Sequence, residues 1–137
     1  MSEEEEKFLV RLHGTFCREV LMHAQTMRSL LEQMQATHGI GDCAPLLRQL
    51  MRAVHSLKGA AGAVNQSELE YLSHTLEQAL ARLQRGDKQI SEVFLALLRR
   101  STVLIEQIAQ SNSTATAPVV PPRLIDEIHR YTEADTS

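Results

Sequence analysis

Residues 53–64 read Ala53-Val54-His55-Ser56-Leu57-Lys58-Gly59-Ala60-Ala61-Gly62-Ala63-Val64, and this stretch decides how the rest of the chain is arranged. At the helical period of about 100° per residue, one apolar stripe collects Leu50, Val54, Leu57, Ala61 and Val64. His55 lies on the opposite face, with Lys58, Gly59 and Gly62 beside it. Each glycine costs a helix about 1 kcal/mol relative to alanine, so helix stability did not select the pair. We interpret the glycines as steric access for another protein to the imidazole.

Composition and charge narrow the class of protein. The 137 residues suffice for one domain with its own core. The net charge of −3 and the scarcity of aromatic residues argue against a nucleic-acid partner. The acidic start lacks the features of a signal peptide, and no apolar run reaches the roughly 18 residues of a membrane span. The two cysteines form no disulfide framework or metal spacing, and Cys17 falls at a buried stripe position. We expect a cytoplasmic protein with no membrane partner.

Two amphipathic helices are predicted in the first half of the chain. The first covers residues 3 to about 36, and its core-facing stripe consists of Phe8, Leu12, Phe16, Val20, Met27, Leu30, Leu31 and Met34. A glycine-containing turn over 37–44 ends it. The second helix runs from about residue 44 to Val64, because Pro45 is tolerated only in a first turn. Asn65 is suited to a left-handed cap after it.

Two further helices complete an all-α, antiparallel, up-down four-helix bundle over residues 1–110. A capping box, Ser67 to Glu70, opens the third helix, and Arg85-Gly86-Asp87 ends it. Its buried stripe is Leu69, Leu72, Leu76, Ala79, Leu80 and Leu83. Ser91 caps the fourth helix, which runs to about Gln110 and buries Phe94, Leu97, Leu98, Leu104, Ile105 and Ile108. A linker follows over 111–122, then a short C-terminal helix over 123–133, with the last six residues frayed.

Glu77 of the third helix is placed to meet His55 across the groove. His55 lies about ten residues before the Asn65-Gln66 turn and Glu77 about twelve after it, so at about 1.5 Å per residue they reach nearly the same height. A carboxylate there accepts the Nδ1–H of His55 and leaves a lone pair on the exposed Nε2. Lys58, one turn on, supplies positive charge for a phosphoryl group at Nε2. The plainer alternative is a surface histidine with solvated neighbours, which this combination disfavours.

The motif resembles that of the histidine phosphotransfer (HPt) domain family. The run from His55 to Gly62 is similar to its phosphoacceptor motif, H-x-(L/I)-K-G-x-x-G. His74-Thr75-Leu76-Glu77 resembles the H-x-(L/M)-E element in the N-terminal phosphotransfer domain of CheA-type chemotaxis histidine kinases. The resemblance implies that His55 is phosphorylated, with Glu77 and His74 as hydrogen-bonding support. It also implies a histidine kinase catalytic domain as donor and an aspartate of a response-regulator receiver as acceptor, in two-component or chemosensory signalling.

The rest of the chain limits what it does alone. Glycine-rich phosphate loops are absent, so ATP and Mg²⁺ are expected on partner domains, with no cofactor in this chain. The remaining histidines, His13, His23, His38 and His129, show no metal-ligand spacing, so no metal site is predicted.

Partner contacts are expected on the His55 face. Arg48 and Arg52 could steer an acidic receiver pocket, and Met51 is either an apolar docking contact or half-buried core. We expect a monomeric phosphocarrier, either free-standing or the phosphoacceptor fragment of a CheA-type kinase. The alternative is a non-phosphorylated helical-bundle adaptor in which His55 is incidental.

Overall fold

The computed structural model describes residues 1–36, 43–86, 90–111 and 119–133. Those ranges contain five helices and no strand: α1 (Glu3–Ala36), α2 (Ala44–Ala63), α3 (Ser67–Gln84), α4 (Glu92–Ala109) and α5 (Pro122–Glu133). The predicted all-α class and the short fifth helix are confirmed. Parts of the predicted turn (37–42) and linker (112–118), together with His38, Asp87 and residues 134–137, lie outside the described residues.

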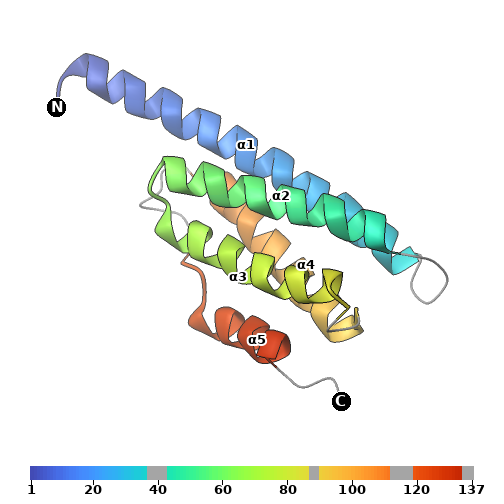
Figure 1. Ribbon diagram of the computed structural model, residues 1–137. Helices are drawn as coiled ribbons and strands as arrows, with labels where there is room; N and C mark the ends of the chain where they lie inside the picture. The colour runs from blue at the N-terminus through green and yellow to red at the C-terminus, as the bar shows by residue number, and fades with distance from the viewer. Residues whose placement is uncertain (37–42, 87–89, 112–118, 134–137) are drawn as a thin grey trace.

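The helices surround one core (Figure 1). α2 packs between α1 and α3, α1 also packs on α4, and α5 lies against α3 and α4 on the side away from α1. Leucines at helical spacing fill the centre, and the largest fully buried side chains include Leu50, Leu57, Leu69, Leu72, Leu76, Leu80, Phe94, Leu98 and Ile105. Among the described helices, none is long and apolar enough to cross a membrane.

The start of α1 corrects one prediction. Phe8 was expected in the core but is 55% exposed, and Leu12 is only half-buried, whereas the stripe is buried from Phe16 onward. α1 has 34 residues and its neighbours α2 and α4 have 20 and 18, so its first turns extend past the end of the bundle (Figure 1). The apolar stripe therefore continues where no described helix covers it. Cys17, also expected to be buried, is half-buried.

Local signals fix most helix ends, with one exception. Pro45 lies in the first turn of α2, Asn65 adopts the predicted left-handed conformation with φ of 58°, and Ser91 Oγ accepts from Phe94 N at 3.2 Å. The predicted capping box is wrong, because Ser67 is already the first residue of α3. The tight turn explains this: Gln66 N donates to Ala61 O at 2.8 Å, so α3 starts directly behind α2.

α5 is held on the bundle by both rings and charges. Leu124, Ile125 and Ile128 are buried, and the ring of Tyr131 stacks on Phe94 with centroids 4.6 Å apart. Outside the apolar contact, Arg100 of α4 forms an ion pair with Glu127. The helix continues through Glu133, so the predicted fraying is wrong for its last two residues, Thr132 and Glu133.

Candidate functional site

His55 stands on the exposed face of α2. Its neighbour Val54 and the next-turn Leu57 are fully buried, while the imidazole itself is 70% exposed. The amphipathic pattern of the helix explains this position, because the buried stripe of Leu50, Leu57 and Ala61 fixes which face meets the core. The ring is therefore presented to solvent on a rigid element rather than on a loop.

Glu77 of α3 holds two groups of α2 at once. Its Oε2 lies 3.3 Å from His55 Nδ1, and its Oε1 lies 2.7 Å from Lys58 Nζ. The tight turn at Asn65 sets this register, as the residue count predicted. Since a carboxylate only accepts, neutral His55 carries its proton on Nδ1 and directs the Nε2 lone pair outward.

The environment of Glu77 keeps it ionised. Its side chain is 19% exposed, and this burial raises its pKa. The hydrogen bonds and positive charges supplied by Lys58 and His55 act in the other direction and outweigh burial, so the pKa lies below the usual carboxyl value. An ionised Glu77 at neutral pH is the form that orients the imidazole and stabilises positive charge on it.

The two glycines beside His55 have different surroundings. A Cβ on Gly59 would meet no atom of the described residues within 4 Å, so none of their side chains requires glycine there. A Cβ on Gly62 would lie 2.7 Å from Glu70 Oε2, and the glycine makes room for that carboxylate. Sequence reasoning missed this contact because it assigned Glu70 to a capping box. That the glycines give a partner protein steric access to His55 stays a prediction. Gly59 is the better candidate for this role.

The predicted docking residues occupy the same face of α2. Arg48 and Arg52 are exposed, about two turns and one turn before His55, respectively. Met51 was expected to be either a docking contact or a half-buried core residue. It is half-buried and packs against the core. Its role as an apolar docking contact stays a prediction.

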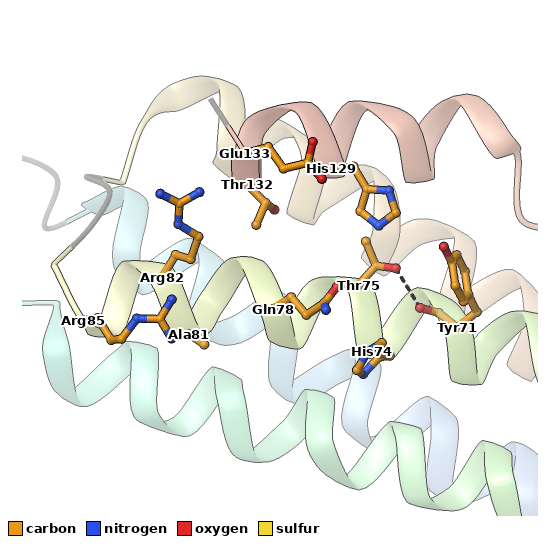
Figure 2. A pocket seen from close by; sticks show the side chains of 10 residues that line it. All are labelled: Tyr71, His74, Thr75, Gln78, Ala81, Arg82, Arg85, His129, Thr132 and Glu133. Carbon is orange, nitrogen blue, oxygen red and sulfur yellow. Dashed lines mark hydrogen bonds between the residues drawn. The ribbon is translucent and has the colours of Figure 1, made fainter. Parts of the chain in front are cut away.

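His74 is the predicted support residue that the structure does not join to His55. Its side chain is exposed at the rim of a cavity between α3 and α5, and it makes no hydrogen bond or ion pair with the described residues (Figure 2). Glu77, three residues later, faces α2 instead. The supporting role of His74 stays a prediction.

Among the histidines outside this site, His13 and His23 have contacts of their own on α1. His13 Nε2 lies 3.3 Å from both Cys17 Sγ and Ser111 O, and His23 lies beside Glu19. Burial raises the pKa of the Cys17 thiol. No group of three metal-ligating side chains occurs in the part of the chain that the structure describes.

Comparison with known proteins indicates the family of this chain. The family model described as "Hpt domain" matches residues 11–130, which include the whole His55 site. The chain is 30% identical over 66 residues, 48% of its length, to chemotaxis protein CheA of Bacillus subtilis. It is 29% identical over 100 residues, 72% of its length, to chemotaxis protein CheA of Cereibacter sphaeroides. No solved structure is significantly similar.

A third relative is the sensor histidine kinase CheAY of Helicobacter pylori, 27% identical over 92 residues, or 66% of this chain. The matched regions amount to only 10%, 15% and 11% of the lengths of the three relatives. The similarity therefore concerns a phosphotransfer module and not a whole kinase. The chain belongs to the Hpt (histidine phosphotransfer) domain family, the phosphotransfer modules of two-component signalling.

Proposed function

We propose that His55 accepts a phosphoryl group from the catalytic domain of a histidine kinase and passes it to an aspartate of a response-regulator receiver. The observation that carries this proposal is the exposed imidazole whose Nδ1 lies 3.3 Å from Glu77. That contact leaves Nε2 as the nucleophile and keeps it accessible.

Phosphoryl transfer to and from His55 takes place in two steps. Nε2 of neutral His55 attacks the γ-phosphorus of ATP, an N–P bond forms, and the P–O bond to ADP breaks. The ring keeps its proton on Nδ1 and becomes positively charged, which the ionised Glu77 stabilises. In the second step an aspartate oxygen of the receiver attacks phosphorus, the N–P bond breaks, and the neutral ring returns.

Lys58 lies close to both Glu77 and His55. Its ammonium is paired with Glu77 at 2.7 Å and lies one turn from His55 on the same face. We assign it to the neutralisation of charge on the incoming phosphoryl group. ATP and Mg²⁺ are supplied by the partner domains, whose acidic, metal-binding sites position the phosphoryl group.

The test is phosphorylation of the full chain by a histidine kinase catalytic domain from the same organism, with γ-labelled ATP. We expect an acid-labile, alkali-stable label that His55→Gln abolishes and the matched control His23→Gln retains. Glu77→Ala should slow labelling while its helical circular dichroism stays that of the wild type. Transfer is then measured as loss of label on addition of a receiver.

Two outcomes contradict the proposal. Label that persists in His55→Gln puts the phosphoacceptor elsewhere. A wild-type chain that takes no label from any histidine kinase of its organism favours the adaptor function, in which the bundle binds partners without carrying phosphate.

A further inference from the structure

A second site lies on the other side of α3, facing α5. A cavity of about 740 Å³ opens there, within the size range of small-molecule sites (Figure 2). Its walls are side chains of α3, of the C-cap residue Arg85 and of α5. Because the two helices are far apart in the sequence, no local sequence motif predicts this cavity.

One end of the cavity is aromatic. The ring of Tyr71 is adjacent to that of His129, with centroids 6.4 Å apart and planes at 82°. Tyr71 is 52% exposed, so its ring is accessible at this end of the cavity. Exposed aromatic rings of this kind bind planar ligands, since stacking on a base contributes about 1–3 kcal/mol.

The middle of the cavity offers hydrogen-bond acceptors. Thr75 Oγ1 donates its proton to Tyr71 O at 2.9 Å, and Thr132 Oγ1 donates to Ile128 O at 2.7 Å. Thr75 itself is buried, with 1% of its surface exposed, so the acceptors open to a ligand are the hydroxyl oxygen of half-buried Thr132 and the amide oxygen of exposed Gln78, which also lines the cavity. A ligand that fills this part must therefore bring O–H or N–H donors.

The opposite end is basic. Arg82, half-buried on α3, rises toward α5 and makes no ion pair within the described residues, and Arg85 follows one turn later (Figure 2). Glu133 on α5 is the acidic side chain of the lining, and it lies too far from Arg82 to form an ion pair with it. Guanidinium groups in this setting bind phosphate through paired, charge-assisted hydrogen bonds.

We propose that this cavity binds a nucleotide, with the base at Tyr71 and His129, the ribose hydroxyls at Thr132 and Gln78, and the phosphates at Arg82 and Arg85. Tyr71 and Arg82 are eleven residues apart on one helix, about 16 Å between their backbones. The long Arg82 side chain tilts toward the helix N-terminus and shortens that gap. The site is separate from the phosphoacceptor site, because Glu77 faces α2 and the cavity faces α5.

The test is a calorimetric titration of the full chain with ADP and GDP at low salt, and with adenosine and pyrophosphate as the two halves of the ligand. We expect saturable binding of at least one nucleotide, about tenfold or more tighter than either half. Backbone amide NMR shifts should change along α3 and α5 and not at His55.

Variants distinguish the contacts. Arg82→Gln should weaken nucleotide binding about tenfold, the loss of one charge-assisted contact, while Arg11→Gln on the exposed start of α1 leaves it unchanged. Tyr71→Ala should weaken ADP and GDP but not pyrophosphate. Glu133→Gln should tighten binding several-fold, because it removes the negative charge that the cavity lining carries. Thermal unfolding by circular dichroism verifies that each variant is folded.

The proposal is overturned if neither nucleotide binds at millimolar concentration, or if folded Arg82→Gln binds like the wild type. Pyrophosphate that binds as tightly as ADP would also overturn it, since the aromatic end would then contribute nothing. Shifts centred on α2 instead of the cavity would do the same.

Discussion

Replacement of Glu77 by glutamine tests the electrostatic core of the site. Glutamine keeps the size of the side chain and an acceptor oxygen but removes the charge that Lys58 and His55 face at 2.7 Å and 3.3 Å. The helices and the apolar core are untouched. Any change in stability therefore reports the charge interactions of one carboxylate.

The expected loss follows from the burial of the partners. Ion pairs on open surfaces contribute about 0.2–1 kcal/mol, and breaking a fully buried pair costs about 3–5 kcal/mol. Lys58 and Glu77 are 30% and 19% exposed, between these limits, and the 70% exposed His55 adds little. We expect Glu77→Gln to lower the free energy of unfolding by about 1–2 kcal/mol at pH 7, measured by urea unfolding with circular dichroism.

The direction of the pKa shift of Glu77 determines how its contribution to stability changes with pH. Because the folded-state pKa of Glu77 is lowered from 4.5, folding favours the ionised form. Its contribution is fully present above that value and is lost as the pH falls through the folded-state pKa. At the lowest pH where both proteins stay folded without urea, wild type and Glu77→Gln should therefore converge.

Two results would refute this reasoning. One is equal stability of the two proteins at pH 7, and the other is a difference that stays constant on acidification. The control is Glu4→Gln, a fully solvated carboxylate near the start of α1, which should change the free energy of unfolding by less than about 0.5 kcal/mol at every pH.

The other predictions concern packing and backbone geometry, and urea unfolding measures each. Phe94→Ala should cost about 3–5 kcal/mol, because the ring is fully buried and stacks on Tyr131; a loss below 1 kcal/mol would mean that α5 is not seated there. Asn65→Ala should cost about 1–2 kcal/mol at its positive φ of 58° while Asn65→Gly costs less, and equal losses would contradict the left-handed turn. Gly59→Ala should stabilise by up to about 1 kcal/mol and Gly62→Ala by less; slower phosphorylation of the stabilised Gly59 variant is the expected sign of partner access, and unchanged rates would contradict it.

Much of this molecule followed from local sequence. The period of the leucines, Pro45, Asn65 and Ser91 predicted where helices run and where they end, because each acts within a few residues of the chain. The turn at Asn65 also made the contact between His55 and Glu77 predictable. Two antiparallel helices joined by a short turn can align in only one register, and in that register the two residues lie at the same height. A side chain's face on a helix and its height above a turn are properties of the chain itself.

The tertiary structure decided two kinds of property. One is the burial of a side chain that depends on where the neighbouring helix ends, and the other is any contact between helices that lie far apart in the sequence. Phe8 continues the apolar stripe of α1, yet it is exposed, because burial requires a neighbour and α2 and α4 end before it. His74 and Glu77 are three residues apart on α3, yet the structure joins only Glu77 to His55, since the packing of α2 and α5 gives the two side chains different surroundings. The cavity exists only because α5, far along the chain, packs on α3 and α4, where Ile128 is buried and the ring of Tyr131 stacks on Phe94.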